Sequence, residues 1–268
     1  MNTIELAKNI RIDAVRATSM AHAGHIGSIL SIADIVAVLY GEILRKNRSE
    51  AGDVFYDKFI LSKGHAGLAV YAALAEIGVL NKNELLNTYY QNGSKFSGHV
   101  SSKNNRGIEL STGSLGQGVG VAVGLALAAK MDKTDARVFT LVGNGECNEG
   151  SVWEAVMFAS AHNLNNFTLI IDQNNLQCMG ASKTILDMGD LENKFRAFGC
   201  EAITIDGHNH KQIKLALSKQ PKTKPLAIIA NTIKGKGVKR MENNNAYHGK
   251  FVDASELDAV IAEIKGGR

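Results

Sequence analysis

The chain has 268 residues, 45% of them hydrophobic, so it is long enough to bury a core without disulfides or structural metals. Its 30 Lys and Arg residues against 26 Asp and Glu residues give a net charge of only +4, and the basic residues are scattered. This pattern excludes a basic nucleic-acid-binding arm. The 27 glycines stand against 2 prolines, which excludes collagen-like and Pro-rich disordered chains and predicts many tight turns.

The cysteines and the N-terminal segment indicate in which cellular compartment the protein is expected. Cys147, Cys178 and Cys200 are odd in number and form no Cys-x-x-Cys pair, which favours a reducing environment over a disulfide or zinc framework. The N-terminal segment is charged and helical in pattern, unlike a signal peptide. The longest apolar run, 118–129, is shorter than the ~20 residues that cross a bilayer. We therefore expect a cytoplasmic protein that does not bind a membrane.

Helix-like and strand-like patterns alternate along the chain. In order, the first half predicts a helix over 3–21, a helix over 31–44 capped by Ser31, a strand over 59–61, a helix over 66–77 ended by Gly78, and a helix leading from the glycine-rich stretch 113–120 to Lys130. The second half predicts strands over 138–142, 167–171, 202–205 and 226–230, and helices over 150–162, 191–198, 211–217 and 256–264. Continuous apolar strands between helices are typical of a parallel sheet covered on both faces. We predict one α/β domain over residues 1–268, with a doubly wound, mainly parallel sheet.

Polar loops follow the two central strands. Gly143-Asn144-Gly145-Glu146 opens a helix, where glycines let backbone N–H groups approach a phosphate. Asp172-Gln173-Asn174 ends the next strand, so adjacent parallel strands would bring Asn144 and Asn174 together as oxygen ligands. Such ligands beside a phosphate suit Mg²⁺ or Ca²⁺ rather than zinc. For either loop alone an ordinary strand-to-helix turn is the alternative, and a dinucleotide fingerprint is incomplete because its third glycine is missing.

Histidines next to glycines are the second signal. His25, His65 and His99 follow glycines in short polar turns, and His248 precedes Gly249. Histidine is suited to proton transfer and to hydroxyl recognition near neutral pH. A single loop histidine is more often a surface residue, but several in one chain favour a polar site with many hydrogen bonds.

Taken together, these motifs resemble the N-terminal, diphosphate-binding half of transketolase, a thiamine diphosphate enzyme. The resemblance covers nearly the whole chain and depends on ordered motifs: the Gly-His-x-Gly at His25, Leu61-Ser-Lys-Gly-His65-Ala, Gly98-His99, Thr112-Gly-Ser-Leu-Gly-Gln-Gly118, Gly143-Asn-Gly-Glu-Cys-Asn-Glu-Gly150, Asp172-Gln-Asn174, Asp206-Gly-His208 and Tyr247-His248-Gly249. It implies a thiamine-diphosphate-binding fold. It also implies transfer of a two-carbon ketol unit from a ketose, or ketose phosphate, to an aldose.

The resemblance also implies a binding role for each matching residue. Asn144, Asn174 and the backbone carbonyl of Leu176 would hold the Mg²⁺ or Ca²⁺ ion that bridges the diphosphate. Gly145 would donate its N–H to a phosphate oxygen, and Gly113 and Leu115 would meet the aminopyrimidine and thiazolium rings. His65 and His248 would lie near the diphosphate. The resemblance also implies cofactor contacts for Gly143, Glu146 and Ser114.

The catalytic roles follow from the same resemblance. His65 and His248 would lie near the reacting centre, His99 would contact hydroxyls of the ketose donor, and His25 would contact oxygens of the acceptor. Glu149 and Glu154 would join a carboxylate network at a subunit interface. Acids in the first turns of a helix also favour its dipole, which is the simpler explanation of this pair.

Departures from the family pattern are few. The family usually has Asp where this chain has Asn144, which removes one negative charge from the metal site, and we expect weaker cation binding than with Asp. Ile26 and Ser114 replace frequent prolines, with an expected effect on loop stiffness only.

The chain lacks the pyrimidine-binding half that the resemblance implies. We expect it to be one subunit of a split transketolase, nearly inactive alone, that pairs with a separate C-terminal subunit in a dimer or an α₂β₂ assembly. A truncated form of a longer chain is the alternative. Other functions left open are a deoxyxylulose-phosphate-synthase-like enzyme, a non-catalytic cofactor-binding scaffold and, more distantly, a nicotinamide dehydrogenase.

Overall fold

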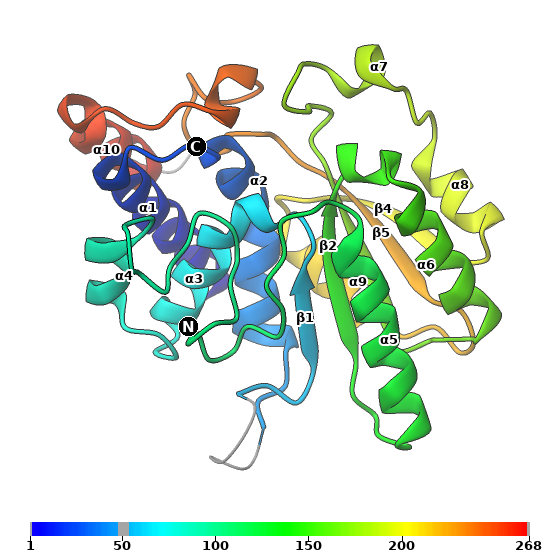
Figure 1. The fold of residues 1–268 in the computed structure, drawn as a ribbon. Coiled ribbons are helices and arrows are strands. Elements are labelled where there is room, and N and C mark those ends of the chain that lie inside the picture. Colours follow the sequence, from blue (N-terminus) through cyan, green and yellow to red (C-terminus); the bar gives the residue numbers. More distant parts are fainter. Residues whose placement is uncertain (1, 48–53, 267–268) are drawn as a thin grey trace.

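The computed structural model describes residues 2–47 and 54–266, and these residues build a five-stranded sheet at the centre of the fold (Figure 1). The strands are β1 (Lys58–Leu61), β2 (Val138–Gly143), β3 (Phe167–Gln173), β4 (Glu201–Asp206) and β5 (Leu226–Asn231). Their order is β1-β2-β3-β5-β4 and every pairing is parallel. All carboxyl ends of the strands therefore point to one edge of the sheet.

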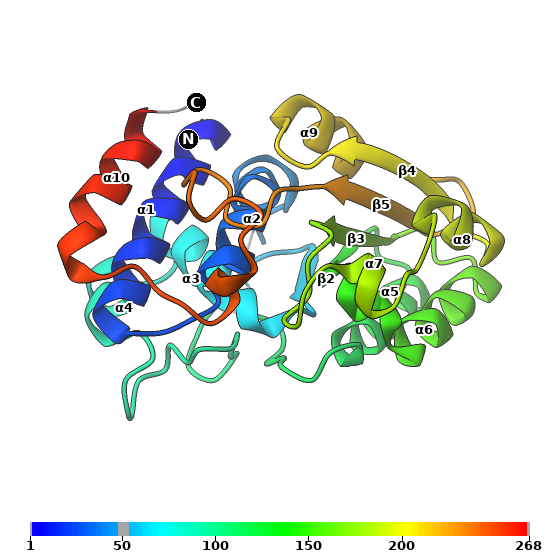
Figure 2. The same cartoon turned by 90° about the horizontal axis from the view of Figure 1, so that it is seen from above.

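Helices cover both faces of this sheet (Figure 2). One face carries α5 (Gln117–Met131), α6 (Gly150–Ala161) and α8 (Leu191–Ala197). The other carries α2 (Ile26–Val38), which continues as a π-helical turn over Leu39–Ile43, and α9 (His210–Ser218). Beyond α2 lie α1 (Thr3–Ala21), α3 (Gly67–Glu76), α4 (Lys82–Thr88) and α10 (Leu257–Gly266), while the short α7 (Ser182–Ile185) lies in the loop after β3.

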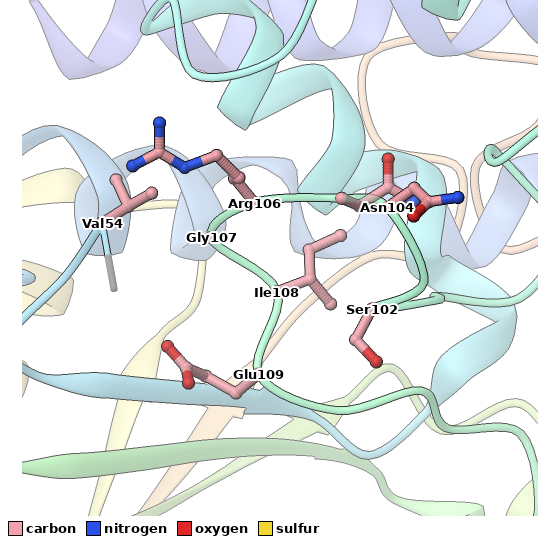
Figure 3. A pocket seen from close by; sticks show the side chains of 8 residues that line it. Val54, Ser102, Asn104, Arg106, Gly107, Ile108 and Glu109 are labelled. Carbon is pink, nitrogen blue, oxygen red and sulfur yellow. The ribbon is translucent and has the colours of Figure 1, made fainter. Parts of the chain in front are cut away.

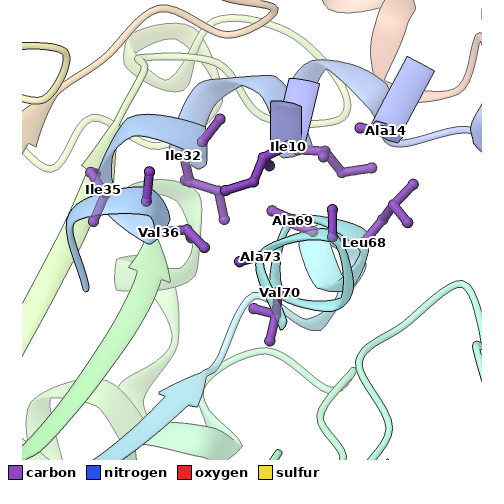
Figure 4. Close-up of a cluster of buried hydrophobic side chains, with 14 of the residues drawn as sticks. Ile10, Ala14, Ile32, Ile35, Val36, Leu68, Ala69, Val70 and Ala73 are labelled. Atoms are coloured by element: carbon purple, nitrogen blue, oxygen red, sulfur yellow. The ribbon is translucent and has the colours of Figure 1, made fainter. Parts of the chain in front are cut away.

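Side chains alternate between two cores, one on each face of the sheet. In β3, Leu169 and Ile171 pack against the α5–α6–α8 side, whereas Ile170 packs against the α2 side. Both faces are apolar because both are covered, as parallel sheets require. On the α2 side, side chains such as Ile10 of α1 and Ile32 of α2 meet α3 (Figure 4). The predicted doubly wound α/β fold is confirmed.

The predicted strands and most predicted helices lie within two residues of the observed ones, but the cap of the second helix is wrong. α2 begins at Ile26, where His25 adopts a left-handed conformation (φ 71°) and donates its backbone N–H to the His248 carbonyl at 2.8 Å. A distant segment therefore sets the start of the helix. Ser31 is buried within α2, and its hydroxyl donates to the Asp172 carboxylate at 2.6 Å.

The prediction also overlooked two features of the helices. The sequence reading missed α4, although Asn81 caps it by accepting the Glu84 backbone N–H at 2.9 Å. Among the described residues, the helix Ile26–Ile43 is long and apolar enough to cross a membrane, with mean hydropathy 1.7, and it is a longer apolar stretch than 118–129. Its length is 83% buried inside the protein, as in a core helix.

Candidate functional site

Loops at the carboxyl ends of four strands carry the candidate site. β1 is followed by Lys63 and His65, β2 by Asn144, β3 by Asn174, and β5 by Lys234. Gly143 pairs with Asp172 in the register of β2 and β3, so the two asparagines leave the sheet from neighbouring strands. Ligands of open α/β sheets bind at this edge.

A cavity of about 280 Å³ opens there. The predicted site residues that line it are His65, Leu115, Gly143, Asn144, Gly145, Glu146, Glu149, Asn174, Leu176 and His248. The sequence reading missed the lining residues Ser28, Lys63, Asn148, Gln177, Cys178 and Lys234. The predicted residues outside this lining are His25, His99, Gly113, Ser114 and Glu154. Substrate-sized space and convergent polar groups make this cavity the binding-site candidate.

The four predicted histidines gather at one side of the cavity. The His25 ring lies 5.4 Å from that of His65, 5.5 Å from that of His99 and 5.3 Å from that of His248, measured between centroids. The rings of His65 and His248 are 5.5 Å apart. Four residues spread over more than two hundred positions of the chain thus form one cluster. His65 and His248 line the cavity, and His25 and His99 lie next to them without lining it.

Two glycines allow the backbone of this cluster to pack closely. A Cβ at Gly24 would lie 2.9 Å from the Gly249 carbonyl oxygen, and one at Gly64 would lie 2.2 Å from that of Thr112. Any side chain at these positions would push the segments of His25 and His248, or of His65, away from their neighbours.

Burial and nearby lysines keep three of these histidines neutral. Burial, then His99, Lys234 and Lys63, lower the pKa of His25. The pKa of His65 is held well below its usual range by burial and by Lys63. Burial and Lys234 lower the pKa of His248 to about 4. Neutral imidazoles can donate at one ring nitrogen and accept at the other, and an anion placed beside them would raise their proton affinity.

Asp172, at the end of β3, organises the floor of the site. Its fully buried carboxylate accepts from the Lys63 ammonium at 2.5 Å, the Asn174 amide at 2.8 Å and the Ser31 hydroxyl at 2.6 Å. Burial acts to raise the pKa of Asp172, but the Lys63 charge and the hydrogen bonds from Lys63, Ser31 and Thr232 hold it below its usual value. Asp172 therefore stays ionised, fixes Lys63, and turns the Asn174 amide nitrogen away from the cavity.

Lys234 is the buried cation without a carboxylate partner among the described residues. Its ammonium lies 3.2 Å from His248 Nδ1 and 3.4 Å from Asn245 Oδ1. Burial, with the Lys63 charge, lowers the pKa of Lys234 to about 8. A buried charge with no counter-ion is costly, so this arrangement favours binding of an anion in the cavity. The sequence motifs assigned no role to Lys234.

His208, from the motif Asp206-Gly-His208, does not line the cavity but supports the loop after β5 that carries Lys234. Its Nε2 accepts the backbone N–H of Ile233 at 2.8 Å, so Nδ1 carries the proton and donates to the Asp34 carboxylate at 2.7 Å. Arg11 forms a second, two-pronged contact with Asp34. This network joins α1, α2 and the loop after β4 to the residue next to Lys234.

Glu146 lines the cavity, yet its carboxylate is used within the protein. It accepts from the Ser62 hydroxyl and from the backbone N–H groups of Gly116 at 2.8 Å and Gly143 at 3.1 Å. Burial raises the pKa of Glu146. These hydrogen bonds join the loops after β1 and β2 to the start of α5. A contact between Glu146 and a ligand stays a prediction.

Of the predicted acids and ring-contact residues, only Glu149 and Leu115 line the cavity. Glu149 and Glu154 are exposed at the start of α6, so the predicted carboxylate network would need a second chain. Leu115 lines the cavity, and a Cβ at Gly113 would lie 3.4 Å from the His99 ring. Ser114 is exposed between them.

The donor chemistry fits a hard cation held by neutral oxygens. Across residues 2–47 and 54–266 no three His, Cys, Asp or Glu side chains gather closely enough to hold a metal ion. The cavity instead offers the amides of Asn144 and Asn174 and the backbone at Leu176, whose N–H donates to Asn174 Oδ1 at 3.0 Å. Oxygen ligands of this kind suit Mg²⁺ or Ca²⁺ when a diphosphate supplies the negative charge.

A second hollow, of about 460 Å³, lies at loop 102–109 (Figure 3). Ser102, Arg106 and Glu109 are among the residues that line it, and the described part of its lining includes no predicted site residue. The convergent polar groups therefore single out the cavity at the strand ends.

Comparison with known proteins assigns the family. Residues 3–265 match the family model described as "Transketolase, thiamine diphosphate binding domain". The chain belongs to this transketolase family. The predicted resemblance and the predicted cofactor, thiamine diphosphate, are thereby confirmed at the level of the family.

Individual relatives agree with this assignment. The 6-deoxy-6-sulfo-D-fructose transketolase subunit SqwG of Clostridium sp. (strain MSTE9) is 39% identical over 244 residues, which cover 90% of this chain and 88% of SqwG. Human transketolase is also 39% identical, over 97% of this chain but only 41% of the human protein. The crystal structure of Campylobacter jejuni transketolase superposes with a TM-score of 0.86 at 31% identity, covering 99% of this chain and 42% of that one. The chain thus spans about two fifths of these long transketolases and nearly all of SqwG.

Proposed function

We propose that this chain is the cofactor-diphosphate subunit of a split transketolase, which transfers a two-carbon ketol unit from a ketose to an aldose. The observation that carries the proposal is the cavity at the strand ends. In a chain of this family, it combines two buried lysines, two side-chain amides and a histidine cluster. The alternatives of a related synthase and of a non-catalytic scaffold stay open to the assay below.

Each group has a distinct part in the proposed site. Lys63 and Lys234 attract the diphosphate, while Asn144, Asn174 and the Leu176 carbonyl hold Mg²⁺ or Ca²⁺ against it. Bound thiamine diphosphate supplies the carbanion chemistry, and the protein supplies binding, orientation and electrostatics.

The histidine cluster would handle protons and hydroxyl groups of the sugars. His65 and His248 line the cavity and stand next to each other, so they can hold or pass a proton at their ring nitrogens. His25 links them to exposed His99, and this line of rings leads from the cavity toward solvent. We propose that the sugar substrates lie along it. The lowered pKa values keep these imidazoles neutral, so each can donate at one ring nitrogen and accept at the other. The negative charge of a bound diphosphate would raise these pKa values toward neutral pH, where an imidazole is an effective general base.

A partner subunit would cover the outer face of α5 and α6, which lie side by side (Figure 1). This face exposes large apolar side chains: Val121, Met131, Met157 and Phe158. A Cβ at Gly120 or Gly124 would meet nothing within 4 Å, so these glycines leave space on this face for side chains of a partner. Leu115, which lines the cavity, lies two residues before the first residue of α5. Exposed apolar surface next to a site is typical of protein interfaces, and we propose a dimer or α₂β₂ assembly in the cytoplasm.

The test is ketol transfer with this chain, thiamine diphosphate and Mg²⁺, with and without a pyrimidine-binding subunit from the neighbouring gene. We expect turnover only when both subunits are present. Full turnover by this chain alone would contradict the split-subunit proposal, and cofactor binding without turnover by the pair would favour the scaffold.

The donor's anionic group is the second variable of this assay. SqwG is named for 6-deoxy-6-sulfo-D-fructose, which carries a sulfonate where a sugar phosphate carries a phosphate. A ketose phosphate and this sulfo-sugar, compared at equal concentration, distinguish the two donor classes.

A further inference from the structure

We propose that Ser182, in the loop after β3, orients the Asn144 amide so that its oxygen faces the cation site. The observation is the hydrogen bond that Asn144 Nδ2 donates to Ser182 Oγ at 2.5 Å. The inference rests on the proposed cation site and adds a positioning residue to it.

The chemistry of an amide requires such a partner. A side-chain amide has one oxygen and one NH₂ group, and only the oxygen can bind a hard cation. The NH₂ group of Asn144 must then point away from the ion. Since Asn144 is only 4% exposed, its NH₂ group needs an acceptor within the protein, and Ser182 Oγ is that acceptor.

Asn174, the other proposed ligand, uses the same principle. Its NH₂ group donates to the Asp172 carboxylate at 2.8 Å, which leaves its oxygen for the backbone N–H of Leu176 and for the cavity. Both amides therefore have their nitrogens bound by acceptors on the protein. For Asn174 the acceptor is Asp172, at the end of a strand, whereas for Asn144 the acceptor is Ser182, in the loop after β3.

The backbone places Ser182 opposite Asn144. Its N–H donates to the Asn175 carbonyl at 2.9 Å, and Leu176 bridges Ala181 in an antiparallel contact. The loop therefore folds back on the end of β3, beside the residues that line the cavity. An aspartate at position 144 would present an oxygen in either orientation and would not depend on this hydroxyl.

The experiment is a double-mutant cycle on cation affinity, with Mn²⁺ titrated into the chain at saturating thiamine diphosphate and free Mn²⁺ followed by EPR. We expect Ser182→Ala to weaken Mn²⁺ binding by about 2- to 10-fold, as loss of one hydrogen bond predicts. In the Asn144→Asp background the same change should have an effect below about 2-fold, a difference that only a coupled pair produces. Ser182→Thr, which keeps the hydroxyl, should restore native affinity.

Thr184→Ala is the matched control, because Thr184 lies in the same loop and its hydroxyl donates to the local Ala181 carbonyl at 2.9 Å. It should leave Mn²⁺ affinity unchanged. An equal loss from Ser182→Ala in both backgrounds, or no loss in either, would overturn the role of Ser182 while leaving the cation site in place. No Mn²⁺ binding by the native chain would overturn the cation site itself, and the inference with it.

Discussion

Replacing Lys234 by Met tests whether the buried, unpaired lysine is the main anchor of the diphosphate. The change removes the charge but keeps a linear apolar side chain in a site where Lys234 is 1% exposed. Lys63, by contrast, already has the Asp172 carboxylate 2.5 Å away. Most of the positive charge that faces the cavity without a counter-ion therefore belongs to Lys234.

The expected magnitude follows from one charge-assisted hydrogen bond, about 1.5–3 kcal/mol, or roughly 10- to 150-fold in affinity for thiamine diphosphate. The pH dependence has a definite sign. Because the pKa of Lys234 is about 8 before binding, native affinity should be constant below that pH and fall above it. Above pH 8 the affinity for thiamine diphosphate should fall by about tenfold per pH unit, until Lys234 also loses its proton in the bound state. The Lys234→Met chain should bind weakly at every pH and show no step near pH 8.

The assay is calorimetric titration of thiamine diphosphate with Mg²⁺ between pH 6.5 and 9.5, with NMR of the His248 ring as a second readout. The pKa of His248, held near 4 by burial and by Lys234, should rise in the variant. Lys236→Met is the matched control, since Lys236 lies on the same loop and pairs with Glu242 at 3.5 Å instead of lining the cavity. Near-native affinity of Lys234→Met, or a retained step near pH 8, would refute the argument.

Three further changes test the fold and the assembly. Burial raises the pKa of Asp13 to about 6 despite Lys82 at 3.0 Å, so ionised Asp13 costs stability that grows as the pH rises from about 4 to about 6. Asp13→Asn should increase the free energy of unfolding by about 1–3 kcal/mol at pH 7.5, with a higher melting temperature, and should leave it unchanged at pH 4. An equal increase at the two pH values would contradict a cost from ionised Asp13. His208→Ala should cost about 1–3 kcal/mol in urea unfolding and speed amide exchange of Ile233; unchanged exchange would rule out its support of that loop. Val121→Glu should leave unfolding of the isolated chain within about 0.5 kcal/mol but prevent co-purification with the partner subunit, and retained assembly would exclude this face as the interface.

Local sequence patterns predicted the central strands and several of the candidate site residues. The apolar runs at β2 and β3 predict buried parallel strands, and the polar residues directly after them predict ligands at the sheet edge. Asn144 and Asn174 were found this way, because neighbouring parallel strands end side by side whatever the rest of the chain does. The glycine–histidine pairs are also local, and the structure gathers His25, His65, His99 and His248 into one cluster.

Contacts between distant segments were decided only by the tertiary structure. Ser31 has the local pattern of a helix cap, but a hydrogen bond from His25 to the far segment at His248 starts α2 earlier and buries Ser31 against Asp172. No local pattern predicted the role of Lys234, because its burial depends on packing between segments that are distant in the sequence. Composition alone predicted that the abundant glycines form turns, whereas the tertiary structure shows that those at the site allow distant backbones to approach within contact distance.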